Sequence, residues 1–97
     1  MSSSIEDLSD PMREVTFIYR NDRAVRVDLV GSFNDWRLGS TPLKKMRNGL
    51  WIVKLKCPTG SYPYMFVVDG NSWLPDPEAA RKVSDGFGRT NSLLVIE

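Results

Sequence analysis

The sequence contains no histidine and only one cysteine, Cys57. An intramolecular disulfide therefore cannot form, and zinc sites built from cysteine and histidine are excluded because too few ligands are present. Cys57 precedes Pro58 and has no histidine to activate its thiol, so we predict a structural role for it. The aspartates occur mainly at turns, where they accept backbone hydrogen bonds. We therefore predict a protein without catalytic residues, cofactor or metal.

The sequence also lacks a strong excess of charge and any long hydrophobic run. Thirteen basic residues stand against twelve acidic ones, and a net charge of +1 gives no electrostatic attraction to nucleic acid. No apolar run approaches the length of a membrane span, and the first residues lack the apolar core of a signal peptide. We therefore predict a cytoplasmic protein, or a fragment of one, that binds neither nucleic acid nor membranes.

What the sequence does contain is a repeated alternation of apolar and polar residues. Turn-forming stretches such as residues 21–24 and 47–49 interrupt it at short intervals. This pattern is typical of an antiparallel β-sandwich and predicts an all-β fold of about seven short strands over residues 14–97. The residues expected on the apolar strand faces include Val15, Phe17, Tyr19, Val25, Val27, Leu29, Val53, Leu55, Tyr62, Tyr64, Phe66 and Val68.

Two segments stand outside the alternating pattern. Residues 1–13 are small and polar without a sustained period, so we predict a flexible lead-in with at most one helical turn around residues 5–8. Residues 74–89 contain two prolines and two glycines, and we predict a long loop with at most one helical turn at residues 78–82. Loops of this length on compact domains are often functional.

The three tryptophans occupy two kinds of position. Trp51 lies in phase with Val53 and Leu55, so we predict that it belongs to the core. Trp36 and Trp73 instead adjoin turn-forming residues. Such a tryptophan either folds back over the edge of the sandwich or forms an exposed platform. A platform suits a sugar, because pyranose C–H groups pack on an aromatic face while nearby polar side chains bind the hydroxyls.

Four segments in order, VDLVGSFNDW, NGLWIVKL, PTGSYPYMFVVDGNSWLPDP and FGRTNSLLVI, resemble carbohydrate-binding module family 48. The resemblance covers residues 14–97 and rests on the ordered series rather than on any one segment. The family comprises immunoglobulin-like, early-set domains of glycogen-branching and debranching enzymes and of the β subunit of AMP-activated protein kinase. It implies an early-set sandwich that binds α-1,4-linked glucan, such as glycogen or a maltooligosaccharide, with a catalytic or kinase partner.

The resemblance also implies which residues form the glucan site. Trp36 and Trp73 correspond to the two stacking tryptophans of the family, and Asn91 corresponds to an asparagine near the final strand. Phe87 aligns with a leucine that threads into the glucan ring in the kinase-subunit domain. Arg89 aligns with the threonine between that leucine and the asparagine. The site is therefore expected to combine residues from three separate parts of the chain.

Met65 departs from the family pattern, because the family's Y-K-F-V-D-G reads YMFVVDG here. Strand alternation places Met65 on the face opposite Tyr64 and Phe66, so we predict an exposed side chain that faces the glucan. Methionine gives apolar contact but no charged hydrogen bond, which predicts weaker binding that Met65→Lys would strengthen. Lys44 or Lys45 is a candidate to replace the missing lysine.

Two functions follow from these residues. The leading hypothesis is a non-catalytic module that binds α-glucan on tryptophan platforms. The alternative is an early-set scaffold or protein-interaction domain with weak or no sugar binding. The methionine at the lysine position supports the alternative, and the two turn-flanking tryptophans support the first.

Overall fold

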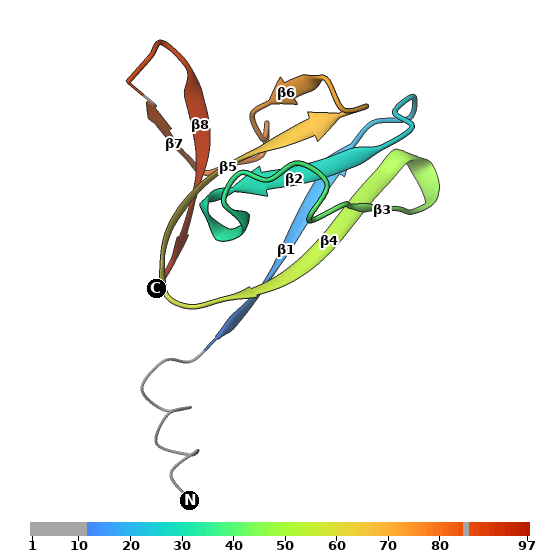
Figure 1. The fold of residues 1–97 in the computed structure, drawn as a ribbon. Helices are drawn as coiled ribbons and strands as arrows, with labels where there is room; N and C mark the ends of the chain where they lie inside the picture. Colours follow the sequence, from blue (N-terminus) through green and yellow to red (C-terminus); the bar gives the residue numbers. More distant parts are fainter. Residues whose placement is uncertain (1–11, 85) are drawn as a thin grey trace, which may run out of the picture.

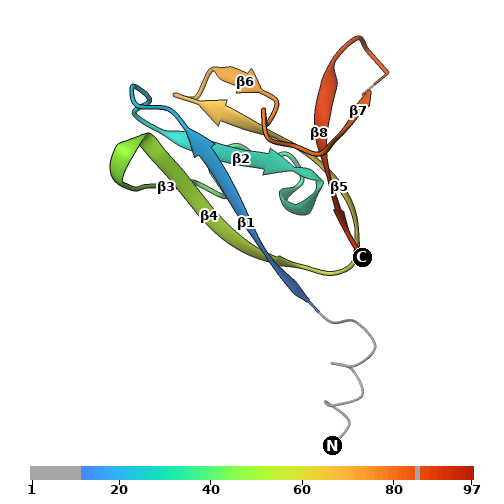
Figure 2. The same cartoon turned by 180° about the vertical axis from the view of Figure 1, so that it is seen from behind.

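The computed structural model describes residues 12–84 and 86–97, which form eight β-strands in two antiparallel sheets (Figures 1 and 2). Sheet A has the strand order β1 (Arg13–Arg20), β4 (Leu50–Cys57), β3 (Lys44–Lys45). Sheet B has the order β2 (Val27–Gly31), β5 (Gly60–Val68), β8 (Thr90–Ile96), β7 (Arg81–Ser84), and β6 (Ser72–Leu74) pairs with β5. The predicted all-β sandwich is confirmed. The predicted flexible lead-in and the helical turn around residues 5–8 fall almost wholly outside the described residues.

The space between the sheets is filled by alternate side chains of both. The core residues are Phe17, Ala24, Val27, Leu29, Leu43, Trp51, Tyr64, Phe66 and Val68. Aromatic rings meet at its centre, where Phe17 and Tyr64 lie edge to face with ring centroids 5.1 Å apart. Trp51 is 4% exposed, so its predicted place in the core is confirmed.

The structure corrects the prediction for the start of β2. Val25 is 85% exposed, and the strand begins only at Val27. Asp69 Oδ1 accepts hydrogen bonds from the backbone N–H groups of Val25 (2.7 Å) and Arg26 (2.9 Å), which holds this segment out of the ladder. Asp28 lies inside β2 rather than at a turn and is 1% exposed. Its carboxylate accepts two hydrogen bonds from Arg26, of 2.7 and 3.0 Å.

The region predicted as a long loop, residues 74–89, contains one short strand, β7, and begins at the last residue of another, β6. Residues 78–82 do not form a helical turn, because Arg81–Ser84 is strand β7 and Glu78 lies in a turn. β7 pairs with β8, with Val83 opposite Asn91. All three residues of β6 and all four of β7 are exposed. Neither strand therefore has a buried face that an alternating pattern could reveal.

β5 organises sheet B, because it pairs with three strands. It pairs with β2 along residues 64–68, with β8 along residues 60–64 and with β6 along residues 66–68. Gly31 allows the end of β2 to lie close to β5: a Cβ atom at this position would lie 2.7 Å from the Pro63 carbonyl oxygen and 2.9 Å from Tyr64 Cβ. The chain continues from Gly31 directly into the 3-10 turn η1 (Ser32–Asn34), which precedes Trp36.

Candidate functional site

The outer face of sheet B carries a small apolar cluster of Val30, Met65 and Val67, and Trp36 packs against it. Val30 lies opposite Met65 across β2 and β5, and Val67 lies opposite Trp73 across β5 and β6. Opposite residues of an antiparallel pair share a face, so all of these side chains point away from the core. Trp73 is 39% exposed and Trp36 is half-buried.

The loop that carries Trp36 has an unusual backbone. Asp35 and Trp36 have φ values of 57° and 56°, in the left-handed region that non-glycine residues seldom occupy. The Asn34 side chain holds the loop, since its Nδ2 donates to Thr41 Oγ1 (3.1 Å) and its Oδ1 accepts from the Gly31 N–H (3.0 Å). The Trp36 N–H also donates to the Gly31 carbonyl, at 2.9 Å. Asn34 therefore builds the loop rather than serving a ligand.

Two hollows adjoin on this face. One, of about 390 Å³, is lined by Trp36, Met65, Trp73, Arg89 and Asn91. The other, of about 460 Å³, is lined by Met65, Asn71, Trp73, Pro75, Arg89 and Thr90. Because three residues line both hollows, we treat them as one groove, the outer groove. Five of the six site residues expected from the sequence meet there. The sixth, Phe87, is 90% exposed in the β7–β8 turn and lines neither hollow.

The predicted exposure of Met65 is wrong. Its side chain points to the outer face, as alternation predicts, but it is only 7% exposed and packs in the cluster against Trp36. Met65 therefore lies at the bottom of the outer groove, where it is largely shielded from solvent. Lys44 and Lys45 do not replace the family's lysine, because both lie in β3 of sheet A. The Lys45 Nζ atom is 5.8 Å from the centre of the Trp51 ring.

The burial of Met65 changes the expected result of Met65→Lys. We expect this variant to lower the free energy of unfolding by about 1–3 kcal/mol, because the new ammonium must lose hydration or displace Trp36. Met65→Leu is the control and should cost less than about 1.5 kcal/mol, since it keeps the apolar volume. Urea unfolding followed by circular dichroism measures both. Equal midpoints for the lysine variant and the wild type would show that the lysine reaches solvent from the groove floor.

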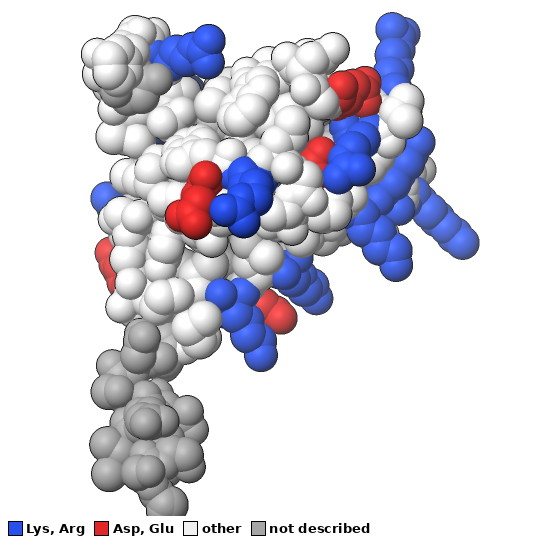
Figure 3. Space-filling view, in the orientation of Figure 1, with Lys and Arg blue, Asp and Glu red and all other residues white. Residues whose placement is uncertain are grey.

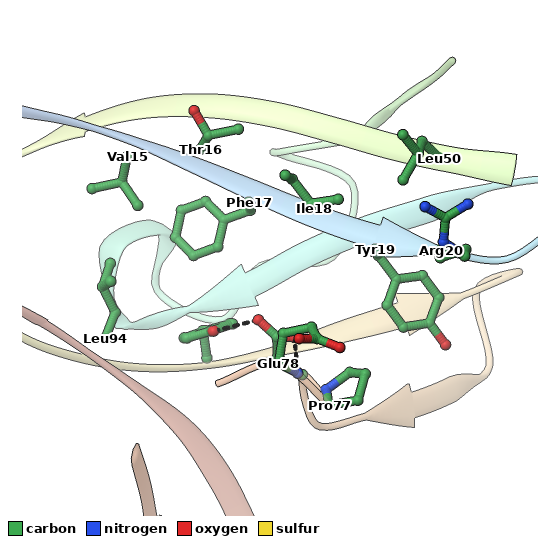
Figure 4. A pocket seen from close by; sticks show the side chains of 12 residues that line it. Val15, Thr16, Phe17, Ile18, Tyr19, Arg20, Leu50, Pro77, Glu78 and Leu94 are labelled. Atoms are coloured by element: carbon green, nitrogen blue, oxygen red, sulfur yellow. Dashed lines mark hydrogen bonds between the residues drawn. The ribbon is translucent and has the colours of Figure 1, made fainter. Parts of the chain in front are cut away.

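A buried hydrogen-bond network fixes the loop that follows Trp73, and the dashed lines beside Glu78 and Pro77 in Figure 4 mark part of it. The Tyr64 hydroxyl donates to Asp76 Oδ2 at 2.6 Å, and the Asp76 N–H donates to Ser92 Oγ at 2.7 Å. Asp76 Oδ1 accepts from the Glu78 N–H at 2.8 Å. Burial, together with the neighbouring Asp76 carboxylate, raises the pKa of Tyr64 well above its usual range. The network ties β5 and β8 to the β6–β7 loop, which supports one wall of the outer groove.

Removing the Tyr64 hydroxyl tests this network. We expect Tyr64→Phe to lower the free energy of unfolding by about 1–3 kcal/mol, because a buried carboxylate loses a hydrogen-bond donor. Tyr19→Phe is the control, since the Tyr19 hydroxyl has no hydrogen-bond partner within the described ranges. Urea unfolding curves of the two variants give the difference. If both variants lose the same stability, the hydroxyl of Tyr64 does not anchor the loop.

Residues 12–84 and 86–97 offer little support for metal binding or thiol chemistry. No three histidine, cysteine, aspartate or glutamate side chains there are grouped as metal ligands would be. Burial raises the pKa of the Cys57 thiol, which disfavours the reactive thiolate. In the same residues, no helix has the length and apolar character required to cross a membrane.

The antiparallel β-sandwich is that of a carbohydrate-binding module, the class to which the family match assigns the chain. The chain belongs to the family described as the glycogen recognition site of AMP-activated protein kinase, whose profile matches residues 13–97. This is the glycogen-binding branch of carbohydrate-binding module family 48, so the resemblance seen in the sequence is confirmed.

Two curated proteins are similar to the chain. It is 35% identical over 85 residues to the protein PTST homolog 2, chloroplastic, of Arabidopsis thaliana, which covers 88% of this chain and 15% of that protein. It is 34% identical over 71 residues to 5'-AMP-activated protein kinase subunit beta-1 of Sus scrofa, covering 73% of this chain and 54% of that subunit.

Among solved structures, the crystal structure of maltogenic amylase from S. marinus matches the fold with a TM-score of 0.72 and 27% identity. The match covers 87% of this chain and 13% of the amylase chain. The chain therefore spans only part of each of the three proteins, at most 54% of the length.

Proposed function

We propose that the chain is a non-catalytic module that binds α-1,4-linked glucan, such as glycogen or a maltooligosaccharide, along the outer groove. One observation carries the proposal: Trp36, from the loop after η1, and Trp73, from strand β6, line a single hollow of about 390 Å³ in a chain of the glycogen recognition family. A groove with aromatic walls and polar groups at its rim suits a ligand with apolar faces and an edge of hydroxyls.

Each side chain has a distinct role in this proposal. Trp73 offers an exposed ring on which a pyranose C–H face packs, and the electron-rich ring face attracts those polarised hydrogens. Trp36 is held by the apolar cluster beneath it, so little side-chain freedom is lost on binding. Asn91 and Arg89 supply hydrogen-bond donors to the sugar hydroxyls. Met65 contributes apolar contact from the floor in place of the family's lysine.

Phe87 extends the proposed site beyond the outer groove. It lies between Gly86 and Gly88, which have φ values of 83° and 88°, in the turn between β7 and β8. Its ring is 90% exposed, an unfavourable environment for a large apolar side chain in water. We propose that it contacts a glucan that lies in the groove.

The setting of the module is also a proposal. The proteins similar to the chain include a kinase subunit and an amylase, so we propose that this chain delivers a catalytic or kinase partner to glucan. The cytoplasmic location stays a prediction from the sequence, and one relative is named as chloroplastic.

Affinity electrophoresis tests the proposed binding. We expect glycogen in a native gel to retard the full chain, whereas dextran, an α-1,6-linked glucan, retards it less. Titration with maltoheptaose should change the tryptophan fluorescence, because two of the three tryptophans line the groove. A folded chain that shows neither retardation nor a fluorescence change would overturn the proposal and favour the scaffold domain.

A further inference from the structure

The outer face of sheet A has a different chemistry from the outer groove. Because Phe17 and Tyr19 point into the sandwich, Ile18 and Arg20 point outward. Ile18 lies opposite Ile52 in β4, and Ile52 lies opposite Lys44 in β3. We define the basic face as Ile18, Arg20, Lys44, Ile52, Lys54 and Lys56.

Positive charge on the basic face is not balanced by neighbouring acids. Glu14, opposite Lys56, is the only acidic residue at an outward position of β1, β3 and β4. In the described part of the chain, no ion pair joins Lys44, Lys54 or Lys56 to a carboxylate. Figure 3 shows lysine and arginine side chains along the right and lower edges of the molecule, with fewer acidic side chains beside them, where Figure 1 places β3, β4, the turn between them and the β1–β2 turn.

β1 leaves one of its edges without a partner strand. The order of sheet A is β1-β4-β3, so one side of β1 has no neighbour among the described residues. Residues 15–19 of β1, VTFIY, carry no charge and consist of residues with high strand propensity. Proteins usually protect such an edge with charge, proline or a covering loop, because its free N–H and C=O groups pair readily with another chain.

A groove of about 510 Å³ runs along this free edge. One part of its lining is apolar, with Val15, Phe17 and Tyr19 of β1 and Leu94 of β8, whereas Asp76 and Glu78 line another part. Figure 4 shows Phe17 and Tyr19 on one side of the β1 ribbon and Thr16 and Ile18 on the other. Ile18 is 48% exposed, so the outward side of the edge is also partly apolar.

We propose that the free edge of β1 accepts an extended segment of a partner protein in which apolar residues alternate with aspartate or glutamate. A strand that adds to β1 continues sheet A, and its side chains must alternate between the two faces of that sheet. Inward apolar side chains enter the part of the groove that Val15, Phe17 and Tyr19 line, and outward side chains lie next to the basic face. Charge complementarity therefore selects carboxylates at the outward positions.

The requirement for an extended peptide backbone distinguishes this partner from other anionic ligands. A nucleic acid or an anionic membrane can neutralise the cations, but neither supplies a row of backbone N–H and C=O groups to the edge of β1. The basic face and the outer groove lie on opposite outer faces of the sandwich, so glucan and peptide should bind without excluding each other. The proposal does not depend on glucan binding.

A synthetic peptide of alternating valine and glutamate, blocked at both ends, is the probe. We expect it to bind the full chain at low salt and to shift the backbone amide NMR signals of β1 most strongly. A peptide of alternating valine and lysine should bind about tenfold more weakly, because its charges are repelled by the basic face. Methylation of the valine and glutamate peptide at every backbone nitrogen should abolish binding, because neither edge of the peptide can then donate ladder hydrogen bonds.

Matched variants of the protein complete the test. Lys54→Glu combined with Lys56→Glu should weaken peptide binding about tenfold, through lost attraction and new repulsion at two exposed sites. Arg81→Glu combined with Lys82→Glu, at exposed positions of β7, is the control and should change binding less than about twofold. Full binding by the methylated peptide, equal effects of the two double variants, or binding of phosphatidylserine vesicles or single-stranded RNA in place of the peptide would overturn the proposal.

Discussion

Replacing Trp51 by alanine is expected to lower the free energy of unfolding by about 3–5 kcal/mol. Trp51 is 4% exposed, lies opposite Tyr19 and donates a hydrogen bond from Nε1 to the Asn21 carbonyl at 3.0 Å. The substitution removes the apolar contacts of a large ring and leaves that carbonyl without its donor. Small domains have total stabilities of about 5–15 kcal/mol, so we expect this variant to be partly unfolded at physiological temperature.

Urea unfolding followed by far-UV circular dichroism measures the loss without relying on the deleted fluorophore. Trp51→Phe separates the two contributions, because it keeps an apolar ring and removes only the indole N–H and part of the volume. We expect its midpoint to fall between those of the wild type and the alanine variant. An alanine variant as stable as the wild type would mean that the core closes around the missing ring.

Trp73→Ala is expected to abolish retention by glycogen while changing the free energy of unfolding by less than about 1 kcal/mol. Trp73 lines both hollows of the outer groove and is 39% exposed on a three-residue strand. Its ring therefore contributes more to the shape of the groove than to the core. Affinity electrophoresis in glycogen and calorimetric titration with maltoheptaose measure the binding.

Leu74→Ala is the matched control for this prediction. Leu74 is the next residue of the same strand, is 38% exposed and lies opposite Phe66 rather than Val67, so it points to the other face. We expect Leu74→Ala to retain glucan binding. If the two variants lose binding equally, β6 as a whole rather than the Trp73 ring is required. Unchanged binding in Trp73→Ala would remove the platform from the proposed site.

Alternation predicted the strands that have one buried face and one exposed face. β1 shows this clearly, because Phe17 is buried while Thr16 and Ile18 on either side are exposed. The same pattern failed at Val25, because a carboxylate far along the chain, that of Asp69, holds the backbone there in a bend. It also failed at β7, where no residue is buried. Local patterns cannot report a partner that lies distant in sequence or a face that nothing covers.

The site shows the same limit. Resemblance to a known family named Trp36, Trp73, Arg89 and Asn91, and the structure brings them to one groove. Alternation gave the correct face for Met65 but not its burial, since it cannot show that the Trp36 loop folds back over that face. No sequence pattern links Tyr64, Asp76 and Ser92, because their hydrogen bonds join three separate segments that meet only in the folded chain.

The three pairings of β5 have a consequence for how the protein folds. β2 and β5 pair Leu29 with Phe66, and β5 and β8 pair Ser61 with Val95, so long loops must close before either ladder forms. Such non-local topologies fold in milliseconds to seconds, whereas the β5–β6 and β7–β8 hairpins need only local closure and should form first. Trp36, Trp73 and Asn91 each follow or belong to a different partner of β5. The outer groove therefore exists only after all three ladders have closed, and recovery of glucan binding during refolding should report the last step of assembly.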